Sequence, residues 1–405
     1  MKIEIENVKG FQDILPPESL KRAEVKRIIE KWYKLYGFVP METPFIEFDE
    51  LMRGDNVQED EAVSDRFRLK DRAGRNLGLR YEFTFQLARV FRQNPNIKLP
   101  FRRYQMGEVF RDEPIGAGRF RQFMQCDVDI IGDADVDADA ECLSVVGDIL
   151  KELKIDFEMR VNNRRLLSSI IESVQISDKN NVMRELDKLD KIGEDMVKMN
   201  LKKYADSNQV VTLFKLMAKP LDFFIENAFD GAKELDELIT KCNKYGIKTK
   251  FDVFMIRGLG YYTGNIFEVK AMGDKNTIAG GGRYDKSVGK FVGREIPAVG
   301  ISFGLERVTE LAKIKVGSIP KVIVISLDKD KEAVKLLKSL RKEGVSCMMM
   351  SGKVGKALEF ANSNSIEYVI FLGDEEVQKK KFKLKNMASG DERLLVEKSL
   401  IKELK

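Results

Sequence analysis

The chain has 405 residues, of which 43% are hydrophobic and 33% are charged, a balance typical of a globular protein with two or three domains. The net charge of +5 permits an RNA partner but does not require one. The sequence contains 0 histidines, which excludes serine–histidine–aspartate triads, histidine general bases and histidine metal ligands. Its chemistry must therefore use carboxylates, lysines or tyrosines, or depend on positioning and charge stabilisation.

The sequence shows no membrane segment and no disulfide framework. No apolar run approaches the ~18 residues that a membrane helix needs. Residues 1–10 alternate charged and apolar side chains, which is unlike a signal peptide. The four cysteines are scattered without a close pair, which argues against zinc sites and for a reducing compartment. We expect a cytoplasmic protein that does not bind a membrane.

The N-terminal part predicts a helix followed by extended chain. Residues 16–36 begin with two prolines and carry an apolar stripe that ends at Gly37, as in an amphipathic helix. Residues 37–48 have the pattern of an extended segment. Pro44 within it indicates a sheet edge or an interface, because proline cannot donate a hydrogen bond to an inner ladder.

The following segment predicts two hairpins. Residues 65–84 predict a hairpin that turns at 71–75, and residues 87–94 predict a short helix. Residues 100–113 and 119–132 then predict two strands, of which the simplest arrangement is an antiparallel pair.

The loop of the second hairpin, residues 114–118, lies between residues that suit a nucleotide. On a strand, Arg111 and Glu113 share a face, as do Arg121 and Phe123. An arginine can meet phosphate, an aromatic ring can stack on a base, and a carboxylate can accept from an exocyclic amine. A solvent-exposed hairpin with cross-strand ion pairs is the alternative, and this stretch alone does not separate the two.

The rest of the chain predicts a helical insert and a second domain. Residues 137–153 predict a helix, and residues from about 165 to 250 are lysine-rich with helical periodicity, typical of an insert. Glycine is frequent over 251–310. Strand–helix–strand alternation then predicts a small α/β domain over 319–405, which leaves 1–318 as the first domain.

Together these stretches resemble histidyl-tRNA synthetase, a class II aminoacyl-tRNA synthetase, nearly from end to end. The pair RGLGYYTG and GGRYD is specific to this synthetase and its paralogues. The other stretches that carry the resemblance are VKGFQDILPPE, LRYEFT, GEVFRDEP, GRFRQFMQCDVDIIG, LDKLDKIG, VGISFGLERV and VIFLGDEE. The resemblance implies an α+β fold, in which an antiparallel sheet flanked by helices carries a helical insert and precedes a C-terminal α/β anticodon-binding domain. It also implies a homodimer, with Pro44 in the dimer-forming motif.

The resemblance implies an ATP site built largely from arginines. Arg111 would hold the α-phosphate and Glu113 the adenine amine. Phe123 would stack on the adenine ring, with Arg307 on its other side. Arg257 would be the catalytic cation over the α-phosphate.

The resemblance also implies a pocket for L-histidine. An acid in such a pocket can accept a hydrogen bond from an imidazole N–H. The pocket would comprise Glu82 and Thr84 at the amino group, Gln125 at the carboxylate side, and Asp129, Tyr262 and Tyr284 around the imidazole.

The implied reaction is the ATP-dependent activation of L-histidine to histidyl-adenylate, followed by transfer to tRNA(His). The attacking carboxylate is already ionised at neutral pH, so no general base is needed. ATP and Mg²⁺ are the implied cofactors, and we predict no metal ligand from the protein itself.

Two features leave alternatives open. Gly260 stands where the family usually has aspartate, which favours a non-catalytic paralogue that serves as regulatory subunit of ATP phosphoribosyltransferase. The retained Arg111, Glu113, Arg257 and Arg307, with the C-terminal domain, favour the enzyme; an RNA-binding module with an inactive core is a third reading.

The lysine-rich stretch 379–385 is the second such feature. It predicts a strand with one basic face, which either contacts tRNA or is a sheet edge protected by lysines. The pattern favours the edge.

Overall fold

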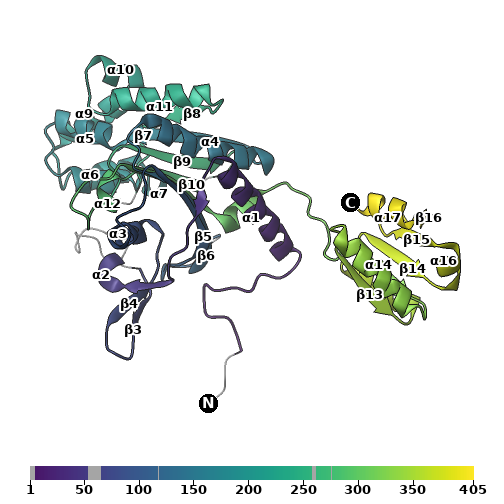
Figure 1. The fold of residues 1–405 in the computed structure, drawn as a ribbon. Helices are drawn as coiled ribbons and strands as arrows, with labels where there is room; N and C mark the ends of the chain where they lie inside the picture. Colours follow the sequence, from purple (N-terminus) through teal and green to yellow (C-terminus); the bar gives the residue numbers. More distant parts are fainter. Residues whose placement is uncertain (1–4, 53–64, 117, 258–260, 275) are drawn as a thin grey trace. The chain divides into compact units, whose positions relative to one another are not determined.

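The chain forms two compact units in the computed structural model, Met1–Ile314 and Lys315–Lys405 (Figure 1). The structure describes residues 5–52, 65–116, 118–257, 261–274 and 276–405. The division falls a few residues before the boundary predicted between residues 318 and 319. Each unit has its own sheet and its own buried core.

The first unit is built on an eight-stranded sheet. Its strands, in spatial order, are β1 (Val39–Pro40), β5 (Phe101–Phe110), β6 (Gln122–Ile131), β11 (Ala298–Gly304), β10 (Thr277–Arg283), β9 (Asn265–Ala271), β7 (Phe157–Asn163) and β8 (Thr249–Phe251). All inner neighbours run antiparallel, whereas the edge strands β1 and β8 run parallel to theirs. The predicted antiparallel sheet is therefore confirmed, and β1 lies at an edge as expected for residues 37–48.

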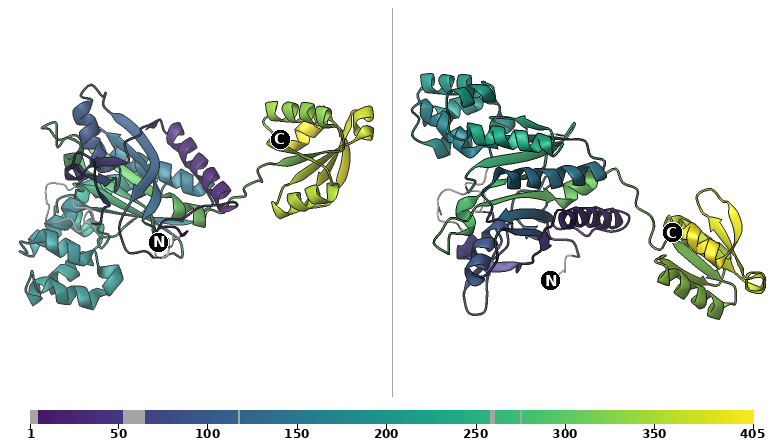
Figure 2. Two further views of the ribbon diagram at one scale, coloured as in Figure 1. Left: turned by 90° about the horizontal axis from the view of Figure 1, so that it is seen from below. Right: turned by 45° about the horizontal axis from the view of Figure 1, so that its top comes forward.

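Helices cover one face of this sheet. These are α1 (Glu18–Leu35), α4 (Val136–Glu152), α13 (Leu305–Leu311) and α11 (Ala232–Lys244), and Figure 2 shows α4 and α11 side by side. Alternate residues of β6, among them Cys126, Val128 and Ile130, are fully buried in the core beneath them. On β6 the residues that alternate with them, Gln125, Asp127 and Asp129, are polar and lie on the other face of the sheet. The helices predicted over 16–36 and 137–153 are confirmed.

A smaller sheet and the insert complete the first unit. The hairpin β3 (Arg68–Lys70) and β4 (Asn76–Leu79) turns at residues 71–75 as predicted, and it pairs with β2 (Ile46–Phe48). The short helices beside it are α2 (Asp49–Met52), α3 (Thr84–Gln93) and α12 (Asp285–Val288). The insert contains α5 (Arg164–Ser173), α6 (Lys179–Leu186), α7 (Leu189–Ile192), α8 (Glu194–Leu201), α9 (Ser207–Met217) and α10 (Leu221–Glu226), followed by α11 and β8.

The second unit is an α/β domain with a five-stranded sheet. Its spatial order is β13 (Cys347–Ser351), β12 (Val322–Ser326), β14 (Tyr368–Leu372), β15 (Lys381–Asn386) and β16 (Glu392–Val396). The helices are α14 (Asp330–Lys342), α15 (Val354–Ser363), α16 (Asp374–Lys379) and α17 (Glu397–Leu404).

The structure corrects the prediction for the lysine-rich strand. β15 lies between β14 and β16, so protection of a sheet edge is the wrong explanation for its lysines. Lys383 and Lys385 instead form ion pairs with Glu392 of β16, at 2.6 and 3.1 Å.

Among the described residues, no helix combines the length and the apolar character needed to cross a bilayer.

Candidate active site

The face of β6 that points away from the covering helices carries the polar residues around which the site is built. Strand alternation places Phe123, Gln125, Asp127 and Asp129 on this face, while the residues between them are buried under the helices. The neighbouring strands β5 and β11 extend the same face on both sides. The carboxyls of Asp127 and Asp129 are both deeply buried.

Asp129 is held between an arginine, a tyrosine and a glycine. Arg103 lies opposite it in the β5–β6 register, with its Nη2 2.7 Å from Asp129 Oδ2. The Tyr284 hydroxyl donates to Oδ1. A Cβ at Gly300 would lie 2.0 Å from that oxygen, so only glycine leaves room for the carboxyl. Burial raises the pKa of Asp129, and the charge of Arg103 opposes this effect.

Several polar atoms of this ion pair make no hydrogen bond to the described residues. Arg103 is fully buried, and its Nε and Nη2 atoms have no hydrogen-bond partner among the described residues. The same holds for Asp129 Oδ2, so the 2.7 Å approach is an ion pair without hydrogen-bond alignment. Buried polar atoms without partners indicate a site that a polar ligand completes.

Three tyrosines form a wall beside Asp129. The ring of Tyr261 lies 4.8 Å from that of Tyr262 and 6.0 Å from that of Tyr284. The Tyr261 hydroxyl donates to Glu82 Oε2 at 3.2 Å. The structure therefore brings the predicted Tyr262, Tyr284 and Glu82 together through Tyr261, which the sequence analysis did not assign.

Glu82 and Thr84 lie at the beginning of α3. Glu82 Oε1 accepts from the Phe85 N–H at 2.7 Å, which satisfies one of the open donors of the helix N-terminus. Burial raises the pKa of Glu82, while hydrogen bonds from Phe85, Thr84 and Tyr261 favour its ionised form. These oxygens can accept hydrogen bonds from an ammonium group.

Gln125 is connected to Asp127 through a serine. Its Nε2 donates to Ser302 Oγ at 2.9 Å, and the Ser302 hydroxyl donates to Asp127 Oδ1. Burial raises the pKa of Asp127 to about 8. Neither Asp127 nor Ser302 was assigned from the sequence.

Arg111, Glu113 and Phe123 gather around Tyr81. The Arg111 guanidinium lies over the rings of Tyr81 and Phe123, at 4.2 and 5.0 Å from their centroids. The Tyr81 hydroxyl donates to Glu113 Oε1 at 2.9 Å. β5 ends at Phe110, so the prediction that the strand continues through residue 113 is wrong, and both charged residues lie in the loop beyond it.

Arg257 and Arg307 converge on the beginning of β10. The Arg257 guanidinium lies over Gly280, where a Cβ would be 2.5 Å from Cζ, and its Nη1 is 4.0 Å from Glu268 Oε1. Arg307 donates from Nη1 to the Thr277 carbonyl at 2.5 Å. The Thr277 hydroxyl in turn donates to Glu268, which links the surroundings of the two arginines.

A third arginine increases the positive charge here. Burial, and next the charge of Arg119, lower the pKa of Arg307. Gly118 lies close by, since a Cβ there would be 3.9 Å from Arg307 Nε. The hairpin loop thus brings one cation beside another, an arrangement that favours an anionic ligand.

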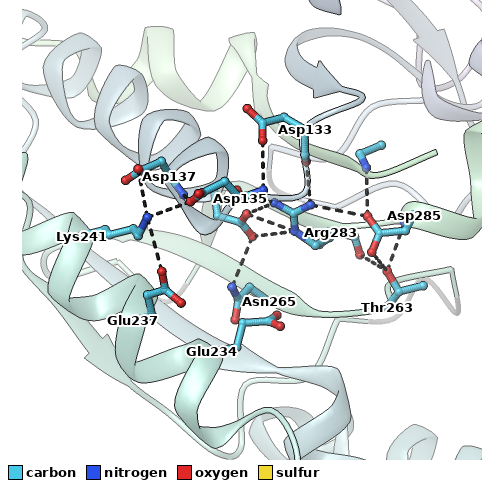
Figure 3. A network of polar contacts seen from close by, with 12 residues as sticks. Asp133, Asp135, Asp137, Glu234, Glu237, Lys241, Thr263, Asn265, Arg283 and Asp285 are labelled. Carbon is cyan, nitrogen blue, oxygen red and sulfur yellow. Dashed lines mark hydrogen bonds and ion pairs between the residues drawn. The ribbon is translucent and has the colours of Figure 1, made fainter. Parts of the chain in front are cut away.

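A buried network fixes the two glycine-rich stretches to each other (Figure 3). Arg283 donates to Asp139 and to the carbonyls of Asp133 and Asp135, which attaches the end of β10 to the beginning of α4. The Thr263 N–H donates to the Arg283 carbonyl at 2.8 Å, and the Thr263 hydroxyl contacts Asp285. Arg283 is therefore structural, while its neighbour Tyr284 donates to Asp129.

Two further aspects concern metal binding and the glycines before Tyr261. Within the part of the chain that the structure describes, no group of three or more acidic or cysteine side chains could hold a metal ion. Magnesium often binds through substrate phosphates, so we treat it as part of the nucleotide substrate. Gly258 and Gly260 lie outside the described residues.

Known proteins share this architecture over almost the whole chain. A family model described as histidyl-tRNA synthetase matches residues 10–308, and one described as anticodon binding domain matches residues 321–405. Histidine–tRNA ligase 1 of Bacillus cereus is 37% identical over 413 residues, covering 96% of this chain and 95% of that protein. Histidine–tRNA ligase of Clostridium tetani is 31% identical over 428 residues, covering 98% and 97%.

Solved structures agree in fold. The crystal structure of histidyl-tRNA synthetase from Nostoc sp. PCC 7120 superposes with a TM-score of 0.88 at 28% identity, covering 100% of this chain and 99% of that one. A Bacillus halodurans structure, described as an ATP phosphoribosyltransferase regulatory subunit/histidyl-tRNA synthetase, has a TM-score of 0.76 at 21% identity and covers 90% and 97%. At that identity the second likeness concerns the fold alone.

The antiparallel sheet with its covering helices, followed by an anticodon-binding domain, defines a class II aminoacyl-tRNA synthetase. The chain belongs to the histidyl-tRNA synthetase family. The predicted family, fold class and enzyme class, a histidine–tRNA ligase, are thereby confirmed.

The Asp139–Arg283 pair gives a prediction about stability. Replacing Asp139 by asparagine leaves the buried Arg283 guanidinium without its anionic partner, and we expect a loss of about 3–5 kcal/mol in unfolding free energy. Asp137→Asn is the control, because Asp137 is exposed and pairs with Lys241 at the surface; its effect should stay within about 0.5 kcal/mol. Chemical denaturation measures both, and equal effects would contradict the structural role of Arg283.

The contact between Gly280 and Arg257 gives a prediction about activity. In Gly280→Ala the new methyl group occupies the space over which the guanidinium lies, so the flexible end of Arg257 must move. We expect aminoacylation to fall about 10²-fold, with little change in melting temperature. Gly355→Ala, which places its methyl group in open space on α15, should leave aminoacylation unchanged. Full activity in Gly280→Ala would show that the position of Arg257 is not critical.

Proposed function

We propose that the chain activates L-histidine with ATP, releases pyrophosphate, and transfers the histidyl group from the adenylate to tRNA(His). One observation carries this proposal: a group of arginines, with Arg119 beside Arg307, lies in the same unit as a buried cluster of acids and tyrosines around Asp129. The arginines suit a triphosphate, and the pocket suits a small cationic amino acid. Membership of the synthetase family supports the pairing of these two ligands.

The nucleotide would lie between the Tyr81 cluster and the beginning of β10. Arg111 would bind the α-phosphate, Phe123 would stack on adenine, and Glu113 would accept from the adenine amine. Arg307 would cover the other face of the ring, and Arg257 would lie over the α-phosphate. The described contacts support this, because Arg111 already lies against the Phe123 ring and Glu113 is oriented by Tyr81.

Histidine would occupy the pocket around Asp129. The Asp129 carboxyl, fixed by Arg103 and Tyr284, would accept from an imidazole N–H. Glu82 and Thr84 would bind the ammonium group. Tyr262 and Tyr284 would enclose the ring, and Gln125 is expected at the carboxylate side.

Activation then needs no side chain that removes a proton. The carboxylate of histidine, ionised at neutral pH, attacks the α-phosphorus, and the bond to pyrophosphate breaks. Arg257 and Arg111 offset the negative charge that develops on the phosphorus oxygens. In the second step a ribose hydroxyl of tRNA attacks the carbonyl carbon and AMP leaves, with an adenylate phosphate oxygen as proton acceptor. A protein with 0 histidines can perform both steps.

Further properties of the family extend the proposal to assembly and location. We propose a homodimer that forms through the region of Pro44. Phe45, Ile46 and Phe48 in this region are about half exposed, as expected for an apolar surface that a second chain covers. We also propose a cytoplasmic location, with which the four free, buried cysteines agree.

The second candidate is a regulatory subunit of ATP phosphoribosyltransferase, which would bind histidine without activating it. The fold shared with the Bacillus halodurans protein favours it. The retained arginine cluster and the anticodon-binding domain over 321–405 favour the synthetase more strongly. An RNA-binding module with an inactive core, the third reading, does not require a pocket for an amino acid.

Histidine-dependent exchange of pyrophosphate into ATP tests the proposed function. A synthetase catalyses the exchange with L-histidine, because adenylate formation is reversible, whereas the regulatory subunit and the RNA-binding module do not. Transfer is tested by adding tRNA and measuring acylation. Histidine binding without exchange would overturn the proposal in favour of the regulatory subunit.

Arg257 provides a sharper test of the mechanism. We expect Arg257→Ala to lower the rate of pyrophosphate exchange by about 10²–10³-fold, because the charge that forms at the α-phosphate loses its stabilising cation. Arg27→Ala removes an exposed arginine of α1 that pairs with nearby Glu24, and it should leave the exchange unchanged. Intact exchange in Arg257→Ala would remove this residue from the mechanism.

A further inference from the structure

A polar relay on β6 and β11 has a direction that determines which end of Gln125 faces the substrate. Ser302 lies directly opposite Asp127 in the register of the two strands, and Gln125 lies one alternation further along the same face. The relay consists of Gln125 Nε2 donating to Ser302 Oγ, at 2.9 Å, and of the Ser302 hydroxyl donating to Asp127. Its three members come from two adjacent strands of the sheet, so the backbone fixes their spacing.

The chemistry of the three groups fixes the direction of the relay. The direction holds for the ionised form of Asp127, because a carboxylate can only accept, and a serine hydroxyl has a single proton to donate. Since Ser302 gives that proton to Asp127, its oxygen must accept from Gln125, which therefore presents its NH₂ group to Ser302. The amide oxygen Oε1 is left buried, without a hydrogen-bond partner among the described residues.

The charges around Asp127 are arranged for a cationic ligand. Arg103 of β5 favours the ionised carboxyl, whereas Asp129 on the same strand and Glu82 before α3 oppose it. Burial adds to this opposition and raises the pKa of Asp127 to about 8. The charge of an ammonium group bound at Gln125 would favour ionisation of Asp127 without direct contact and so maintain the direction of the relay.

We propose that Ser302 and Asp127 are positioning residues that hold the Gln125 amide with its carbonyl oxygen toward the α-ammonium group of the amino acid. A free amide oxygen suits an ammonium donor and would repel a carboxylate. The inference rests on the proposed function, and it replaces the expectation that Gln125 contacts the carboxylate side with a contact to the ammonium group. Neither residue touches the substrate; both act through Gln125.

Two analogues of histidine separate the two ends of the substrate. L-Histidinol keeps the ammonium group and lacks the carboxylate, whereas 3-(imidazol-4-yl)propanoate keeps the carboxylate and lacks the ammonium group. In Ser302→Ala we expect the Kd of L-histidinol, measured by calorimetry, to rise about tenfold, since one hydrogen bond to a charged group is lost. The Kd of the propanoate and the KM for ATP should not change.

Further variants test whether the two residues act as one unit. Asp127→Asn should weaken L-histidinol in the same way, because an asparagine NH₂ can donate to Ser302 and allow the Gln125 amide to turn over. The double variant should be no weaker than the weaker single variant, as expected for members of one relay. Ser302→Thr, which keeps the hydroxyl, should restore binding. Thr309→Val is the matched control: the buried Thr309 hydroxyl has no hydrogen-bond partner in the described structure, and L-histidinol should bind normally.

The outcomes decide the inference separately from the proposed function. An unchanged Kd for L-histidinol in Ser302→Ala would overturn the relay, and so would equal weakening of both analogues. If Ser302→Ala does not fold, Asp127→Asn and Ser302→Thr decide the same comparison. Absence of histidine-dependent exchange in the wild type would instead overturn the proposed function, while the calorimetric comparison still measures the role of the relay in ammonium binding.

Discussion

The ion pair between Arg103 and Asp129 is the interaction on which the rest of the site depends. Both residues are buried, and a buried charge needs a partner because the protein interior replaces water poorly. The pair joins β5 to β6 and fixes the position of the acid. Tyr284, which directly follows β10, donates to the same carboxyl, so this one group connects three parts of the sheet.

Charged side chains in this protein lie flat on a sheet because glycine leaves space for them. Arg257 rests over Gly280, and the carboxyl of Asp129 rests over Gly300. A side chain at either glycine would overlap the charged group above it. Glycines within residues 251–310 therefore provide space for the charged groups of the site, which is a different role from making the chain flexible. The rigid sheet supports the preorganised charges on which catalysis without histidine must rely.

One further contact of the site, the pairing of Arg103 with Asp129, could have been predicted from the sequence. A hairpin centred on Gly116 implies that residue numbers of paired positions sum to a constant, and the observed register follows this rule. Arg103 opposite Asp129 was therefore predictable from the loop at 114–118. The contacts of Tyr261 with Glu82 and of Arg307 with the Thr277 carbonyl join distant segments, and no local pattern shows them. The lysine-rich strand was misplaced because β16, its outer neighbour, had not been predicted.

The nearness of Arg119 to Arg307 has a consequence for the position of the hairpin loop. One guanidinium belongs to a hairpin loop and the other to the first turn of α13, so their mutual repulsion pushes a loop away from a helix. A polyanion between them turns this repulsion into two attractions. In the proposed function the nucleotide would be the counter-ion of the loop, and small inorganic anions at high concentration would compete with it for the same place.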